Sequence, residues 1–404
     1  MKKQILFISY GCGHSNSLIP IAKLLNSNKD LEVNAIGLTL AKNDYLKAGI
    51  NTLSSSDILE ESALKYQDII EKYLPTEKNP NIEEIDTQAY YLTGFADLVE
   101  NFGYFEAEKK ISKYNRYCFY PINFARRYLV KNKPDLLITS ICPRSELAFN
   151  NAAHELGIES IAISDVFVID EEEYVCKENY AKNLTVISEA VKERLLKNGC
   201  KSKIYVLGNP AFDNLLNENK KTKKEVIKKK FGLNEKKKTI LWAMSEYDKF
   251  GNSLESENEN NTRFKFIDVL NLLSSSALSN NYEFILRTSP KSEYNIKDKV
   301  FSNGIICPKN LSVKEAFDIS DIVLVEFSTV GLEAFIYGLP VIQLGYRKSA
   351  PYGKLKIAKQ VFDLNGLKTL LSNLKDINYH QGYSYPKGNS AKKIADLCLK
   401  LIKN

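Results

Sequence analysis

A glycine turn that ends in a histidine follows the first apolar run of the chain. The run from Ile5 to Ser9 is followed by Gly11, Cys12, Gly13 and His14. Glycines permit a tight turn whose backbone comes close to a ligand, and a helix that begins there offers unpaired N–H groups to an anion. Histidine titrates near neutral pH, which suits it to act as a general base. The alternative interpretation is a histidine that only hydrogen-bonds the turn.

A second candidate site lies in the last quarter of the chain. An apolar run from Ile322 to Val325 precedes a turn with Ser328 and Thr329, and a helical pattern follows from Val330. The two hydroxyls and the amides at this helix start can bind a diphosphate. Glu333, about one turn further on, can accept hydrogen bonds from ribose hydroxyls. The alternative is an ordinary helix cap with an acidic residue in the first turn.

A carboxylate follows another apolar run. Asp165 comes directly after the run from Ser160 to Ser164. Ligands of parallel sheets bind outside the carboxyl ends of the strands, so Asp165 is a second candidate catalytic residue beside His14. It could equally cap the turn that follows.

Short apolar runs alternate with helical patterns along the whole chain, which is typical of α/β folds with buried parallel sheets. The length of 404 residues exceeds what one hydrophobic core supports and predicts two domains. The polar segment at 251–262 is expected to be a loop. The expected strands are Ile5–Ser9, Val33–Leu38, Asp135–Ser140, Ser160–Ser164, Leu184–Ser188, Ile204–Leu207, Thr239–Ala243, Glu283–Arg287, Gly304–Cys307, Ile322–Val325 and Pro340–Leu344.

Composition excludes several classes of protein. Hydrophobic residues make up 44% and charged residues 26%, as in ordinary globular proteins. The net charge of +7 arises from 56 basic and 49 acidic residues, a balance that does not indicate a nucleic-acid partner. Seven cysteines without a C-x-x-C pair indicate neither a disulfide framework nor a zinc site, and they fit a reducing cytoplasm. No apolar run approaches the length of a membrane span.

Three motifs resemble those of the GT-B superfamily of glycosyltransferases. Strand, Ser-Thr, Glu-Ala and Gly-x-Pro-Val, in that order at 322–341, resemble its donor-nucleotide motif. Gly-Cys-Gly-His, followed by Pro20, resembles the glycine-rich loop of the peptidoglycan N-acetylglucosaminyltransferase and of nucleotide-sugar hydrolases of nonulosonic acid synthesis. Gly208-Asn209-Pro210 is similar to the segment that closes the first domain in those transferases and in UDP-N-acetylglucosamine 2-epimerases.

The resemblance implies an α/β protein of the GT-B fold, with two Rossmann-like domains that face each other across a cleft. Residues 1–212 would form the acceptor side with the glycine loop and His14, and residues 213–404 would bind the nucleotide-sugar donor. The segment from Ser390 to Asn404 has the pattern of an amphipathic helix. In this family such a helix often crosses back to the first domain; a plain packing helix is the alternative.

The resemblance also implies further contacts with the nucleotide sugar, by Asn209, by Ser245 at a phosphate and by Arg287 in the cleft. One departure stands out. The epimerases and the capsule and teichoic-acid type transferases carry a His-Pro or His-Arg-Arg-Glu motif where this chain has Ser289-Pro290, which argues against both subfamilies.

The predicted activity is metal-independent transfer of a sugar from a nucleotide-diphosphate donor, with a UDP-sugar favoured, to a sugar or glycan acceptor. His14 would be the general base, and the nucleotide sugar would be a substrate, with no cofactor. By analogy the product would be a bacterial surface polysaccharide or glycoconjugate. The alternatives are a UDP-N-acetylhexosamine 2-epimerase, a nucleotide-sugar hydrolase and a non-catalytic subunit that binds a nucleotide sugar. The oligomeric state is not predicted.

Aromatic and basic residues gather between Tyr114 and Tyr128. They could stack on a sugar acceptor, or meet an anionic surface and give peripheral association with the inner face of the membrane. Core aromatics with solvated arginines are the third interpretation.

Overall fold

The computed structural model describes residues 2–216, 223–252, 264–289, 296, 301–373, 383–386 and 388–403. The chain forms two compact units, Met1–Asp213 with Pro386–Asn404, and Asn214–Tyr385. The segment 251–262, predicted to be a loop, lies mostly outside the described residues. No helix of the described residues is long and apolar enough to cross a membrane.

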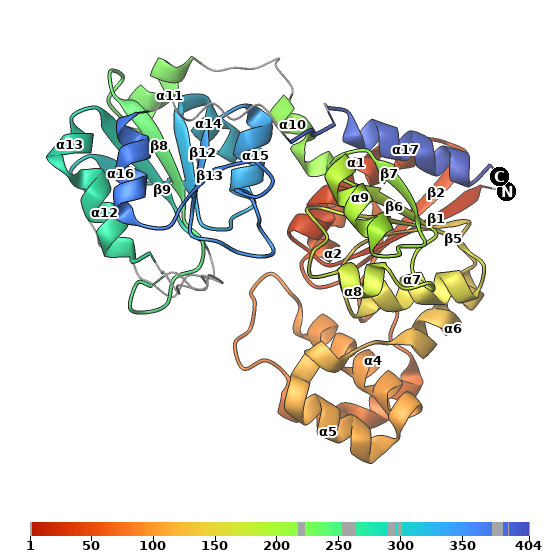
Figure 1. Ribbon diagram of the computed structural model, residues 1–404. Helices are drawn as coiled ribbons and strands as arrows, with labels where there is room; N and C mark the ends of the chain where they lie inside the picture. The colour runs from red at the N-terminus through yellow and green to blue at the C-terminus, as the bar shows by residue number, and fades with distance from the viewer. Residues whose placement is uncertain are drawn as a thin grey trace. The chain divides into compact units, whose positions relative to one another are not determined.

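The first unit contains a seven-stranded parallel sheet in the order β3-β2-β1-β4-β5-β6-β7 (Figure 1). The strands are β1 Lys3–Ser9, β2 Leu31–Gly37, β3 Asn51–Leu53, β4 Leu136–Ser140, β5 Glu159–Ile163, β6 Asn183–Val186 and β7 Lys203–Val206. The α-helices are α1 Gly13–Asn26, α2 Ala41–Lys47, α3 Gln67–Ile70, α4 Glu84–Phe102, α5 Tyr104–Tyr114, α6 Ile122–Asn132, α7 Ser145–Glu155, α8 Glu172–Val175, α9 Glu189–Lys197, α10 Asp213–Leu216 and α17 Ser390–Leu401.

Apolar residues that alternate along β1 enter two cores, one on each face of the sheet. Ile5 and Phe7 pack with α1 and α17, whereas Leu6 and Ile8 pack with α6 and α7. A strand buried on both faces must be apolar throughout, which is why the sequence shows continuous runs. The helices α3 to α5 lie between β3 and β4 in the chain and have a core of their own.

The second unit contains a six-stranded parallel sheet in the order β10-β9-β8-β11-β12-β13. The strands are β8 Lys238–Ala243, β9 Tyr282–Arg287, β10 Gly304–Ile306, β11 Ile322–Val325, β12 Val341–Leu344 and β13 Lys359–Val361. The helices are α11 Lys224–Lys230, α12 Phe266–Ser274, α13 Ser276–Ser279, α14 Val313–Ile319, α15 Val330–Tyr337 and α16 Leu364–Ser372. Trp242 and its neighbours form the core beneath α12 and α16.

The strand order reverses near the centre of each sheet, between β1 and β4 and between β8 and β11. Ligands of doubly wound sheets bind at the carboxyl ends of the strands where the order reverses. Gly11 and His14 follow β1, and the Ser328 turn follows β11. Two of the sequence-predicted sites therefore lie where the topology favours a ligand.

The last helix packs within the first unit. Asp213 caps the start of α17, because its carboxylate accepts the backbone N–H groups of Ser390 and Ala391, each at 2.8 Å. Ile394 and Cys398 are buried against α1. Residues 386–404, which the sequence analysis counted with the second domain while allowing for a helix that returns, belong to the first unit.

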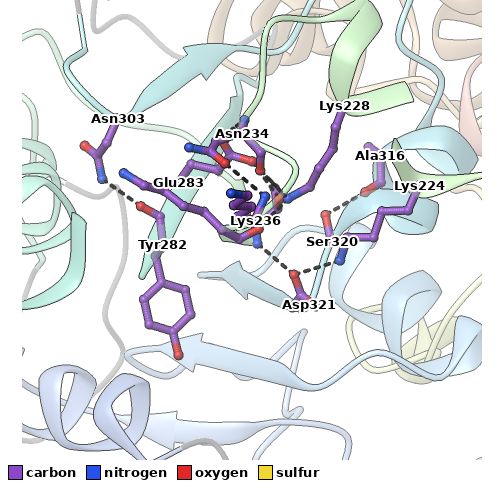
Figure 2. A network of polar contacts seen from close by, with 12 residues as sticks. Lys224, Lys228, Asn234, Lys236, Tyr282, Glu283, Asn303, Ala316, Ser320 and Asp321 are labelled. Carbon is purple, nitrogen blue, oxygen red and sulfur yellow. Dashed lines mark hydrogen bonds and ion pairs between the residues drawn. The ribbon is translucent and has the colours of Figure 1, made fainter. Parts of the chain in front are cut away.

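A buried ion pair fixes the amino ends of β8 and β9 in the second unit. Lys228 and Glu283 approach to 3.0 Å, with side chains that are 1% and 7% exposed (Figure 2). Lys228 also donates to the carbonyl oxygen of Asn234, and Glu283 accepts the N–H of Asn234 and the hydroxyl of Thr239. Each charge is thus matched by hydrogen bonds as well as by its partner.

Replacing Lys228 with methionine is expected to lower the free energy of unfolding of the second unit by about 3–5 kcal/mol, because Glu283 would remain buried without its partner. Urea unfolding followed by fluorescence of Trp242, the single tryptophan, measures this change. Lys229→Met, at an exposed position of the same helix, is the matched control. Equal stabilities of the two variants would contradict the assignment.

Candidate functional site

A cavity of about 440 Å³ lies in the first unit, between the carboxyl edge of the sheet and the helical segment around α4. His14 is in its wall, as are Tyr10, which follows β1, and Arg144, which precedes α7. Tyr90 and Tyr91 of α4 line it from the other side. One cavity of the first unit therefore brings a candidate base, several aromatic rings and a guanidinium group together.

His14 is connected to a buried carboxylate through a serine. Its Nδ1 atom lies 2.9 Å from the hydroxyl oxygen of Ser140, the last residue of β4. The Ser140 hydroxyl donates to Oε2 of Glu146 at 2.5 Å, and the backbone N–H of Tyr10 donates to Oε1 at 3.0 Å. The strand end, the helix start and the glycine turn thus meet at one carboxylate.

Glu146 is completely buried in the first turn of α7. Burial raises the pKa of its carboxyl group, and the charge of His14 and the hydrogen bonds from Ser140 and Tyr10 oppose that rise. Neither Ser140 nor Glu146 was predicted as a site residue from the sequence. The available signal was an acidic residue in the first turn of the helix that follows a buried strand.

Arg144 has an unusual backbone conformation for a residue with a side chain. Its φ angle is +70°, a region that costs a residue other than glycine about 1–3 kcal/mol. Its guanidinium carbon lies 4.9 Å from the ring centre of Tyr10 and 5.7 Å from that of Tyr117. Among the described residues, its buried Nε atom has no hydrogen-bond partner. Such strain is typical of functional sites, and the sequence analysis did not single out this residue.

The two glycines of the turn differ in their surroundings. A Cβ atom on Gly11 would lie 2.5 Å from the Cβ of Leu40, so packing against the segment after β2 already requires glycine there. A Cβ atom on Gly13 would lie 3.5 Å from Oδ2 of Asp165, an ordinary contact. Asp165 is therefore next to the turn that carries His14, as its position after β5 predicted.

Asn209 joins three segments of the first unit. Its side-chain oxygen accepts the hydroxyl of Ser17 at 3.0 Å and the N–H of Ala211 at 2.9 Å. Its side-chain N–H donates to the carbonyl oxygen of Asp165 at 2.8 Å. The residue is 2% exposed, and these three hydrogen bonds give it a structural role. A contact of Asn209 with a nucleotide sugar stays a prediction.

In the second unit, a buried carboxylate connects the loops after β8 and β11. Glu326 accepts hydrogen bonds from the indole N–H of Trp242 at 3.2 Å, the hydroxyl of Tyr247 at 2.6 Å and the backbone N–H of Ser245 at 2.8 Å. Burial raises the pKa of Glu326, and these three donors oppose the rise. The hydroxyl of Ser245 accepts the N–H of Phe327 at 3.1 Å. Ser245, predicted to contact phosphate, thus binds the neighbouring loop in this structure. Glu326 was not predicted from the sequence.

The predicted diphosphate site lies at the start of α15. Thr329 is the residue before the helix and is exposed, with helical backbone angles and no side-chain cap. The hydroxyl of Ser328 accepts the N–H of Val330 in a long contact of 3.4 Å. Tyr352 fixes the turn, because its hydroxyl donates to the carbonyl oxygen of Ser328 at 2.9 Å. Gly331 permits this approach, since a Cβ there would lie 2.8 Å from the tyrosine ring.

Two arginines lie near this helix start. Arg287 ends β9, and its charge opposes the rise that burial causes in the pKa of Glu333. Arg347, which follows β12, places its guanidinium carbon 4.0 Å from the ring centre of Phe327. Arg287 and Glu333 were predicted from the sequence; Arg347 was not. Positive charge and helix N–H groups in one place suit a phosphate-bearing ligand.

Comparison with known families gives one match. The model of the family described as CDP-glycerol:poly(glycerophosphate) glycerophosphotransferase matches residues 164–346. This segment contains Asp165, Asn209, Ser245, Arg287 and the Ser328 turn. No curated protein matches the sequence significantly.

Solved structures resemble the chain along nearly its whole length. The UDP-GlcNAc 2-epimerase of Neisseria meningitidis is 14% identical, with a TM-score of 0.58 over 98% of this chain and 100% of that one. The glycosyltransferase of kitacinnamycin is 10% identical, with a TM-score of 0.56 over 100% of both chains. The wall teichoic acid polymerase TagF is 16% identical, with a TM-score of 0.54 over 99% of this chain and 89% of that one. These matches confirm the resemblance that the motifs indicated: the chain has the GT-B fold.

Proposed function

We propose that this protein is a transferase that moves a sugar from a nucleotide-diphosphate donor, with a UDP-sugar favoured, to a hydroxyl group of an acceptor in cell-surface polymer synthesis. The observation that carries the proposal is the position of His14. It lies in the wall of a cavity at the carboxyl edge of the first sheet. Its ring is hydrogen-bonded to Ser140, whose hydroxyl donates to the buried Glu146. The match to a family of cell-surface polymer transferases supports the same class of reaction.

His14 would act as the general base. As the acceptor oxygen forms its bond to the anomeric carbon of the donor sugar, the hydroxyl proton passes to the ring nitrogen of His14 that does not contact Ser140. The bond from that carbon to the diphosphate oxygen breaks, and its electron pair leaves with the nucleoside diphosphate. Asp165, beside the turn, is the proposed second polar group near the acceptor.

The second unit would hold the donor. The helix start at Ser328, Thr329 and Val330, together with Arg287, would stabilise the charge that develops on the leaving diphosphate. Glu333 would accept hydrogen bonds from the ribose hydroxyls. The Ser245 hydroxyl can still donate its proton to a phosphate oxygen while it accepts the Phe327 amide, so its predicted contact is compatible with its structural task.

The cavity of the first unit would take the acceptor. Tyr10, Tyr90 and Tyr91 line it with ring atoms against which a sugar or polyol can pack, and the Arg144 guanidinium lies over the Tyr10 ring. Arg116, near the start of the aromatic and basic stretch, also lines the cavity, and Tyr117 contacts Arg144. Most of the stretch fits the interpretation of core aromatics with solvated arginines. Phe119 and Phe124 lie in the core, and Arg126 and Arg127 form exposed ion pairs with carboxylates.

A second candidate follows from the family match. With CDP-glycerol as donor, the acceptor oxygen would attack the phosphorus that carries glycerol, and CMP would leave. The same base would serve both reactions, because in each the acceptor hydroxyl loses its proton. The two candidates differ in the nucleotide that is released.

Product analysis separates these candidates. The protein is incubated with UDP-N-acetylglucosamine or with CDP-glycerol, each with and without a glycan acceptor, and the released nucleotides are measured by chromatography. Release of UDP that depends on the acceptor is the expected result, whereas CMP release would select the second candidate. Conversion without acceptor would identify an epimerase or hydrolase, and binding without conversion would identify a non-catalytic subunit; both contradict the proposal.

His14→Ala is expected to reduce kcat by about a hundredfold or more, the usual contribution of a general base. Nucleotide release at saturating donor measures the loss. His154→Gln, a half-buried histidine near the end of α7 and outside the cavity, is the control. An unchanged kcat in His14→Ala would remove this residue from the mechanism.

Arg287→Gln is expected to weaken binding of the nucleoside diphosphate by about tenfold to a hundredfold, because a hydrogen bond to a charged group contributes about 1.5–3 kcal/mol. Titration calorimetry with UDP and CDP measures the affinity. Lys354→Gln, an exposed change of the same charge in the second unit, controls for the general loss of positive charge. Equal affinities of both variants would contradict the donor assignment.

A further inference from the structure

Glu146, Ser140 and His14 form a chain of hydrogen bonds whose protons can be assigned. The contacts are 2.5 Å between the Ser140 oxygen and Oε2 of Glu146, and 2.9 Å between the Ser140 oxygen and Nδ1 of His14. A serine hydroxyl has one proton to donate. It can therefore donate to one of these neighbours only, and it must accept from the other.

When Glu146 is ionised, the direction of this chain of hydrogen bonds is fixed. A carboxylate can only accept, and Glu146 already accepts the Tyr10 amide at its other oxygen. The Ser140 proton therefore goes to Glu146, and the Ser140 oxygen accepts a proton from His14. This arrangement places the histidine hydrogen on Nδ1 and leaves a lone pair on Nε2.

We propose that Glu146 and Ser140 are positioning residues that hold neutral His14 in the tautomer with its proton on Nδ1, so that Nε2 is free to accept a proton from the acceptor. The inference rests on the proposed function for the role of Nε2. The tautomer itself is a property of the free protein and does not depend on which substrate binds.

The charged neighbours of His14 do not compete for Nδ1. The charge of His14 opposes the rise that burial causes in the pKa of Glu146 and of Glu171. The carboxylate of Asp165 lies beside Gly13, the residue before His14. Among the described residues, Ser140 is the hydrogen-bond partner of the ring. The serine is completely buried, which keeps water from replacing it.

Glu146→Gln should reverse the chain with almost no change in shape. The Tyr10 amide needs an acceptor, so the glutamine oxygen takes the place of Oε1 and its NH₂ group faces Ser140. The NH₂ group donates to Ser140, the serine proton turns to Nδ1 of His14, and the histidine hydrogen moves to Nε2. The nitrogen that should act as the base would then carry a proton.

The tautomer is measured by ¹⁵N NMR of protein labelled at histidine, without substrate, in a pH series in which the chemical shifts themselves identify the neutral form of the ring. His14→Gln assigns the signal. We expect Nδ1–H in the natural protein, Nε2–H in Glu146→Gln, and loss of the Nδ1–H preference in Ser140→Ala. Glu155→Gln, an exposed carboxylate on the same helix, should keep Nδ1–H. An Nε2–H tautomer in the natural protein, or an unchanged tautomer in both Glu146→Gln and Ser140→Ala, would overturn the inference.

Kinetics supply the second readout. Glu146→Gln and Ser140→Ala should lower kcat by about tenfold or more with little change in KM for the donor, since neither residue belongs to the proposed donor site. Ser140→Ala removes a single oxygen atom and covers the case in which Glu146→Gln does not fold. An Nδ1–H tautomer together with a fully active His14→Ala protein would contradict the proposed function and leave the tautomer assignment intact. Full kcat in a folded Ser140→Ala protein would overturn the positioning role.

Discussion

Burial of both faces of a parallel sheet leaves only the strand ends for polar chemistry. In each unit, helices cover the two faces and the strands are apolar along their length. Polar side chains and free backbone groups therefore collect in the loops between strands and helices. In each sheet, the loops on either side of the reversal of strand order diverge and leave room for a ligand. The candidate residues of both units follow from this one constraint.

Both units have a buried glutamate at a corresponding place in the topology. In each, a buried glutamate that comes after the strand beside the central one accepts a backbone N–H from the loop after the central strand. Glu146 accepts from Tyr10 after β1, and Glu326 accepts from Ser245 after β8. Burial of a carboxylate is costly unless hydrogen-bond donors surround it, and such hydrogen bonds are strong away from water. Each glutamate therefore holds the loop that supplies its donors in one conformation. Rigid loops of this kind are what a site needs to present a base or to hold a phosphate.

Much of the fold could be predicted from the sequence because apolar runs and turn residues are local signals. The strands around Ile5 and Ile322, the glycine turn and the turn at Ser328 were all predicted near their observed places. The helical segment between β3 and β4 was not, since its core depends on contacts among its own helices rather than on a simple alternation. Fold class and the approximate positions of the strands are the parts that local pattern determines best.

The candidate site was harder to predict because its decisive contacts join distant residues. Glu146 accepts a hydrogen bond from the backbone N–H of Tyr10, which lies 136 positions away in the sequence. No local sequence pattern predicts such a pair. Gly11 shows the opposite difficulty: its place in the turn suggested a ligand, yet the close approach of Leu40 already explains it. Residue types at strand ends indicate where chemistry can occur, and only the three-dimensional contacts show which of them support others.

The return of α17 to the first unit makes the second unit an insertion within the first in terms of chain order. Ile394, Ala395 and Cys398 complete the core that includes Leu18 and Ile21 of α1. During synthesis, the core of the first unit is therefore complete only after α17 has been made, whereas all residues of the second unit precede α17. The second unit can thus complete its core before the first unit does, although residues 2–213 are synthesised before it.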